Sequence, residues 1–158
     1  MALPQKVTAV LFPTGAPREL CGIGLGDRFS ALSLPAFWSD SHSEGKVRFG
    51  CLDVAEGGIS KVTCSVTDTL GRVSHVQMSL ELESEGAEKQ VFRELGEVFT
   101  RRCGKGTRAK KTVEWPVAGA LEGRLDVRNA SFTMQGDRVY RVEVTLYLGP
   151  GVEIVADT

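Results

Sequence analysis

The feature that most constrains the fold of this chain is an internal repeat at an offset of 66 residues. The segment GRVSHVQMSLEL at residues 71–82 matches DRVYRVEVTLYL at residues 137–148, and the alignment extends upstream without a gap to residue 56. Nine of the 27 aligned pairs are identical. Two amphipathic strands can look alike by chance, but an ungapped match through two turns favours duplication of one structural unit.

Each unit is predicted to be one helix followed by three strands. In the second unit, apolar residues at helical spacing predict a helix that is capped by Ser84 and stopped by Gly104. Alternating apolar residues then predict three strands. These strands lie at residues 111–117, 123–134 and 138–148, and their counterparts in the first unit lie at residues 46–54, 59–68 and 72–82.

This pattern predicts an α+β fold in a single domain over residues 1–158. We expect two tandem αβββ repeats, at about residues 20–82 and 86–148, that form one antiparallel sheet of about six strands with the helices packed on one face. A short strand-like segment at residues 6–12 precedes them.

The glycine-rich stretch GIGLGDRFSAL at residues 22–32 aligns with the helix of the second unit. It is therefore predicted to be a tight turn that leads into a short helix capped by Asp27. A phosphate-binding loop is not expected, because the spacing is GxGxG, antiparallel hairpins follow it, and no Lys-Ser/Thr pair is present.

The bulk composition is that of a globular protein, with 42% apolar and 25% charged residues. No apolar run is long enough to span a bilayer, and the first residues lack the apolar core of a signal peptide, so we expect a cytoplasmic protein. The four cysteines and two histidines lack metal-ligand spacing. We expect no metal, no cofactor and no catalytic residue, and the oligomeric state stays open.

The cysteines allow two interpretations. A two-residue turn at Gly57-Gly58 would place Cys51 directly opposite Cys64, close enough for a cross-strand disulfide. The equivalent pair in the second unit is Val117 and Ala130, which favours reduced thiols that act as small core residues. The same alignment places Trp115 opposite Phe132.

Two groups of residues are candidates for binding a partner. The uncovered face of the sheet is predicted to carry polar side chains, including His75, Gln77, Arg141, Glu143 and Tyr147. The segment RRCGKGTRAKK holds six basic residues and no acid, on a body with a charge of −7; these are Arg101, Arg102, Lys105, Arg108, Lys110 and Lys111. It is either a solvated helix end or a site for an acidic protein surface, and the lack of interleaved aromatics argues against nucleic acid.

The plan of tandem helix-plus-sheet repeats is similar to the β-lactamase-inhibitor-protein-like architecture, and GIGLGDRF resembles the Gly-apolar-x-Leu-Gly turn that opens such units. The resemblance covers about 130 residues and implies a concave sheet that is presented to a protein. It carries over no inhibitory residue, and the chain departs from the secreted inhibitors in lacking a visible signal.

The function expected from these observations is that of a non-catalytic protein-binding module, such as an inhibitor or immunity-type protein that neutralises an enzyme, toxin or effector. We expect no nucleic-acid or membrane partner. Two alternatives stay open. One is a carrier of a small ligand or lipid in a cavity between helices and sheet, and the other is an enzyme whose residues converge only in space.

Overall fold

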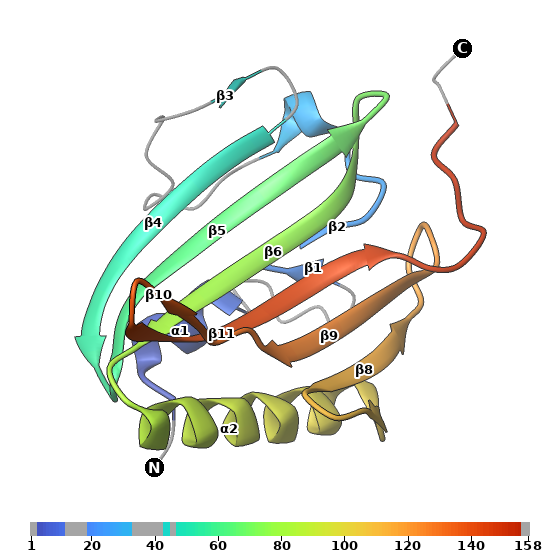
Figure 1. Cartoon of the computed structure of the whole chain (residues 1–158). Coiled ribbons are helices and arrows are strands. Elements are labelled where there is room, and N and C mark those ends of the chain that lie inside the picture. Colours follow the sequence, from blue (N-terminus) through green and yellow to red (C-terminus); the bar gives the residue numbers. More distant parts are fainter. Residues whose placement is uncertain (1–2, 12–18, 33–42, 45–46, 156–158) are drawn as a thin grey trace.

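The computed structural model describes residues 3–11, 19–32, 43–44 and 47–155, and one large antiparallel sheet forms most of it (Figure 1). Its strands are β3 (Ser43–Glu44), β4 (Val47–Glu56), β5 (Ile59–Thr69), β6 (Arg72–Leu82), β7 (Thr107–Arg108), β8 (Thr112–Val117), β9 (Gly123–Asn129), β10 (Phe132–Met134) and β11 (Asp137–Leu148). A separate hairpin is formed by β1 (Glu19–Leu20) and β2 (Ile23–Gly24).

The order of the strands sets the two halves of the chain side by side. The sheet runs β3-β4-β5-β6-β11-β9-β8-β7, and β10 adds to β11. The last long strand of each half, β6 and β11, pair antiparallel at the centre, from Tyr140 opposite Leu82 to Tyr147 opposite His75. The α+β class is therefore as expected, but the sheet is larger than six strands because short strands extend both edges.

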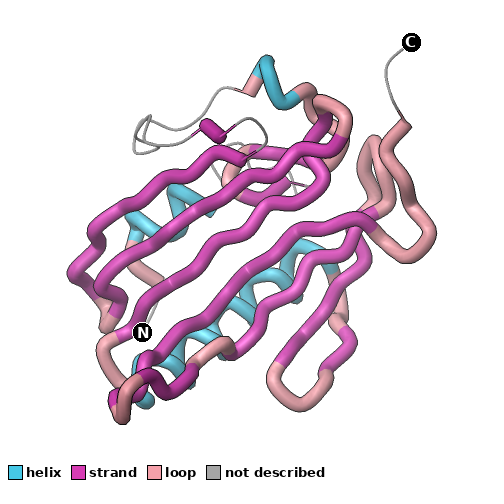
Figure 2. Tube along the Cα trace, turned by 45° about the horizontal axis from the view of Figure 1, so that its top comes forward, coloured by secondary structure: helices cyan, strands magenta, loops and turns pink. Residues whose placement is uncertain are grey.

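Two helices, α1 (Gln5–Leu11) and α2 (Glu85–Cys103), lie on the same face of the sheet (Figures 1 and 2). Helix α2 begins as predicted, since the Ser84 hydroxyl accepts a hydrogen bond of 3.1 Å from the Ala87 N–H. It ends at Gly104, whose φ of 88° suits a residue without a Cβ. Its apolar side packs against β8, β9 and β11 and buries Val91, Leu95 and Phe99.

Alternation along the strands separates a core face from an open face. In β6, Val76, Met78, Leu80 and Leu82 are buried against the helix side, as expected from their spacing. The residues between them point to the other face, which no helix covers in Figure 2. The described residues thus form a sheet with one apolar face and one polar face.

The first part of the chain departs from the expected structure. Residues 5–11 form helix α1 rather than a strand, with Val7, Val10 and Leu11 buried on one side. Within residues 22–32 the only helical element described is a 3₁₀ turn at Phe29–Ala31, and Asp27 does not cap it. The glycines break the helical pattern here, because Gly22 and Gly26 both adopt positive φ.

The glycine-rich stretch has a structural role of its own. The Gly26 N–H donates to the Val73 carbonyl at 2.9 Å, and the Val73 N–H donates to the Asp27 carbonyl at 2.8 Å. This stretch therefore bonds the start of β6, ahead of the part that pairs with β11. Leu25 packs against Gly123, where an added Cβ would lie 2.4 Å from the leucine side chain.

The register of β4 overturns the predicted cysteine pair. The two-residue turn at Gly57-Gly58 is present, with Glu56 opposite Ile59. A bulge between Asp53 and Glu56 then inserts one extra residue in β4, so Cys51 faces Thr63 and Cys64 faces Gly50. Because a shift by one residue reverses the side of the sheet, Cys51 is exposed whereas Cys64 is buried.

The buried Cys64 meets another thiol. Its sulfur lies 3.9 Å from that of Cys21, which is also buried, and all four cysteines are free thiols. The hydrogen bond with Cys21 and burial both raise the pKa of Cys64, so this thiol stays protonated. The interpretation as small core residues therefore holds for Cys64, but its partner is Cys21.

The predicted pairs of the second half are also wrong. Trp115 lies opposite Leu125, and Val117 lies opposite Gly123. Phe132 belongs to β10, where it faces Val139 and lies under the guanidinium of Arg141. The reason is that the turn between β8 and β9 spans residues 118–122, whereas the alignment with Gly57-Gly58 places it at residues 123–124, so the register of this pair shifts.

Candidate functional site

The predicted open-face residues converge on the central strands, β6 and β11. Glu143 is buried, and its carboxylate accepts a hydrogen bond from the Gln77 side-chain amide. Arg128 on the neighbouring strand β9 approaches the other carboxylate oxygen, with 3.6 Å between Nη2 and Oε1. The centre of the open face is therefore a paired polar cluster rather than a set of free charges.

Arg141 and Tyr147 lie at the two ends of this cluster. The Arg141 guanidinium stacks 5.0 Å from the centre of the Phe132 ring, and its Nη2 lies 3.8 Å from Glu81 Oε1. The Tyr147 hydroxyl donates to Glu114 at 2.8 Å. Burial and the Glu114 carboxylate together raise the pKa of Tyr147 to about 12.

Asp126 on β9 completes the cluster with an acid that is incompletely satisfied. It lies opposite Thr145 and Glu114, and its Oδ1 is buried without a hydrogen-bond partner among the described residues. Burial raises the pKa of Asp126, although Arg128 acts in the opposite direction. A buried carboxylate oxygen without a hydrogen-bond donor favours the protonated form, in agreement with the raised pKa.

His75 lies on the same face, opposite Tyr147 and Thr67. Burial lowers its pKa, and Glu143 partly offsets this by raising it. The neutral imidazole can therefore both donate and accept hydrogen bonds near neutral pH.

The predicted basic residues divide into two sets. Arg101, Lys105 and Arg108 line one groove beside the C-terminal half of α2. Arg102, Lys110 and Lys111 do not line this groove. Arg93 joins the groove from two turns earlier in the helix, and sequence reasoning missed it, although Arg93, Glu97 and Arg101 follow helical spacing.

Cys103 lies near these cations at the end of α2. Burial raises its pKa, and the opposing influence of Arg102 is smaller. A raised pKa reduces the thiolate fraction of Cys103 at neutral pH.

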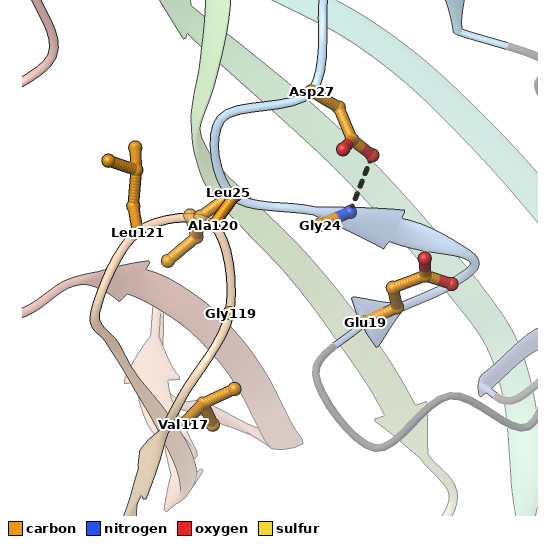
Figure 3. Close-up of a pocket in the computed structure, with 8 residues that line it drawn as sticks. All are labelled: Glu19, Gly24, Leu25, Asp27, Val117, Gly119, Ala120 and Leu121. Carbon is orange, nitrogen blue, oxygen red and sulfur yellow. Dashed lines mark hydrogen bonds between the residues drawn. The ribbon is translucent and has the colours of Figure 1, made fainter.

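The glycine-rich stretch borders a groove of about 310 Å³ (Figure 3). Loop residues 119–121 form the opposite wall, and the polar groups on the side of the glycines are the carboxylates of Glu19 and Asp27. The Gly24 N–H, which a phosphate would need, instead donates to Asp27 at 2.9 Å. Two carboxylates and an occupied amide make this groove unsuitable for a phosphate group.

Within the part of the chain that the structure describes, no three His, Cys, Asp or Glu side chains are grouped to hold a metal ion. The helices in these described ranges are all too short or too polar to cross a membrane. Comparison with protein families, with curated proteins and with solved structures finds no match to this chain.

Proposed function

We propose that this chain is a non-catalytic protein-binding module of the inhibitor or immunity type, which neutralises a partner enzyme or toxin by covering it with the open face of its sheet. The observation that carries the proposal is the contrast between the two faces. Helices and the β1–β2 hairpin cover one face, whereas β6, β11 and β9 present a connected set of polar side chains on the other.

The arrangement of this face supports recognition of a protein. Glu143, Arg128 and Gln77 hold one another in place, and Tyr147 is held by Glu114. Side chains that are already ordered lose little conformational entropy on binding. Arginine and tyrosine are residue types that often contribute most of the binding energy at protein interfaces. Because the charged side chains of the open face are paired with one another, the face would select its partner protein by the positions of these groups rather than by net charge.

The carrier alternative has less support. Phe99 and Trp115 are both buried, and their ring centres lie 5.7 Å apart, so aromatic side chains fill the space between α2 and β8. The enzyme alternative would need a pocket that joins His75 or Cys103 to a carboxylate. Neither residue lines any of the three grooves formed by the described residues around α1, α2 and the glycine-rich stretch.

We further propose that the chain arose by duplication of one unit and has a β-lactamase-inhibitor-protein-like plan. The strand order supports this, because β4-β5-β6 and β8-β9-β11 each run in chain order from the side of the sheet inward to the central pair of β6 and β11. The tight turns Leu70-Gly71 and Gln135-Gly136 each have positive φ at both positions. The two units differ in two respects. The two turns are 65 residues apart rather than 66, and the first unit has no long helix over residues 22–32.

The test is affinity purification from extracts of the native organism, with variants that separate the two faces. Ser79→Arg introduces a bulky side chain beside Glu143 at the centre of the open face. Gln90→Arg adds the same charge on α2, and its neighbour Glu94 can pair with either side chain.

We expect one protein to bind wild type and Gln90→Arg and to be lost with Ser79→Arg. The inhibitor hypothesis further requires that this protein lose its activity when wild type is added. Recovery of the same protein by Ser79→Arg, or turnover of a substrate by the chain itself, would contradict the proposal.

A further inference from the structure

A basic groove lies on the helix side of the sheet, and its geometry points to a second binding site. It has a volume of about 610 Å³ and lies between the C-terminal half of α2 and the β7–β8 hairpin. Its lining consists of Arg93, Gly96, Glu97, Thr100, Arg101, Lys105, Gly106, Arg108 and Val113. We refer to these residues as the α2 groove.

Two glycines give the groove its shape. Gly96 lies in the middle of α2, where glycine weakens a helix, and a Cβ built on it would have no atom within 4 Å. Packing therefore does not require a glycine at this position. The absence of a side chain on Gly96 leaves the groove open. Gly106 is required, because its Cβ would lie 2.7 Å from the indole of Trp115. The backbone at Gly106 consequently packs directly against that ring.

The charges of the groove are unbalanced. Four exposed cations line it, namely Arg93, Arg101, Lys105 and Arg108, against the single acid Glu97. Among the ion pairs between described residues, none involves any of these five side chains. Arg101 also suits the negative end of the helix dipole, but Arg93 is too far from that end and Arg108 is outside the helix. The dipole alone thus does not account for the cluster.

We propose that the α2 groove binds an acidic peptide segment of another protein, with carboxylates at its cationic rim and an apolar side chain over Gly96. Charge complementarity selects the acidic residues, and the open floor beside Gly96, Thr100 and Val113 accommodates the apolar one. Single-stranded nucleic acid is a poorer fit because Trp115 is 0% exposed and cannot stack on a base. The groove and the open face are on opposite sides of the sheet, so this inference does not rest on the proposed function.

The experiment is an amide and indole NMR titration of the whole chain. The probe is a capped peptide of alternating glutamate and leucine, and the control peptide has glutamine in place of glutamate. A short single-stranded DNA is titrated in parallel. We expect the acidic peptide to shift the signals of Gly96, Thr100 and Gly106 and of the Trp115 indole N–H, while the glutamine peptide leaves them in place.

Three variants test the geometry. Gly96→Leu fills the open floor without changing a charge, and should weaken binding by at least about tenfold. Replacing Arg101 and Lys105 by glutamine should weaken it roughly fivefold, as exposed charge pairs do. The matched control replaces Lys110 and Lys111 by glutamine, which removes the same charge from outside the groove and should leave the affinity within about twofold.

Each result decides the question. The proposal is overturned if no signal moves, if the DNA binds more tightly than the peptide, or if the Lys110/Lys111 control weakens binding as much as the Arg101/Lys105 variant. If Gly96→Leu does not fold, the comparison of these two charge variants still gives the answer. Loss of peptide binding in Gly96→Leu together with unchanged partner capture by the open face would separate the two sites.

Discussion

Glu88 provides the most direct test of how α2 is attached to the sheet. This carboxylate lies in the first turn of α2 and is only 5% exposed. One of its oxygens accepts a hydrogen bond from the Asn129 side-chain amide, and the other accepts from the Ser131 hydroxyl. Ser131 in turn accepts from the Arg141 N–H at 2.9 Å. A single acidic side chain therefore joins the start of α2 to the irregular segment between β9 and β10.

The expected loss of stability follows from these partners. In Glu88→Ala the Asn129 side-chain amide loses its acceptor, which costs about 1–3 kcal/mol, and the Ser131 hydroxyl keeps only its longer hydrogen bond, of 3.3 Å, to the Arg141 carbonyl. The favourable interaction of the negative charge with the helix N-terminus, about 0.5 kcal/mol, is also lost. We therefore expect Glu88→Ala to lower the free energy of unfolding by about 3 kcal/mol. Glu88→Gln keeps one acceptor oxygen and should lower it by about half as much.

The assay is urea unfolding, with thermal melts as a second measure. A loss of about 3 kcal/mol corresponds to a fall in Tm of roughly 6–12 °C for a chain of this size. Glu85 provides the matched control, since it lies in the same helical turn but is exposed and pairs only with Lys89, at 3.3 Å. Glu85→Ala should cost less than about 0.5 kcal/mol. Equal losses for Glu85→Ala and Glu88→Ala would refute the reasoning, because then charge at the helix start would matter and the buried bonds would not.

Three further predictions concern other parts of the chain. Gly106→Ala should lower the unfolding free energy by about 2 kcal/mol and change the near-UV spectrum of Trp115, because its Cβ would lie 2.7 Å from that indole; an unchanged melt would contradict the tight packing. In timed labelling with a thiol reagent, Cys51 should react at once and Cys64 only on unfolding, since Cys64 is buried and its pKa is raised; similar rates would be inconsistent with the register of β4. Burial lowers the folded-state pKa of His75 below its usual value of 6.5. The stability that the neutral imidazole contributes is therefore present above pH 6.5 and is lost as the pH falls through the folded-state pKa. In His75→Asn the free energy of unfolding should change less with pH over this range.

The sequence predicted the elements whose evidence is local. The α2 helix carries its apolar spacing, its Ser84 cap and its Gly104 stop within one segment, and all three are found in the structure. In β6 the alternation of apolar and polar residues identified the buried face correctly. Such patterns are reliable because each element must bury one side whatever its neighbours are. In contrast, the glycines at residues 22–26 prevented helix formation that the repeat alignment had implied.

The register between strands could not be predicted, because it depends on single residues with unusual backbone angles. Ala55 adopts a φ of 49°, and the bulge beside it moves Cys51 to the exposed side of β4. Alanine gives no sign of this in the sequence, since left-handed backbone usually falls on glycine or asparagine. The core positions of β4 are Leu52 and Val54 instead. The error in the cysteine pair therefore follows from one inserted residue, although the turn itself was predicted correctly.

The α2 groove could be predicted only in part, because its residues come from separate segments of the chain. Residues 101–111 are one basic run in the sequence, but the fold distributes their charges over different surroundings, so only part of the run faces the α2 groove. Arg93 belongs with that part because two turns of α2 place it on the same side as Arg101. Gly96 is also part of this surface. A glycine in the middle of a helix lowers helix stability, and no neighbouring atom requires a glycine at this position. We therefore expect Gly96→Ala to raise the free energy of unfolding by about 1 kcal/mol and to weaken peptide binding. This result would mean that the glycine lowers the stability of α2 but keeps the groove open for a ligand.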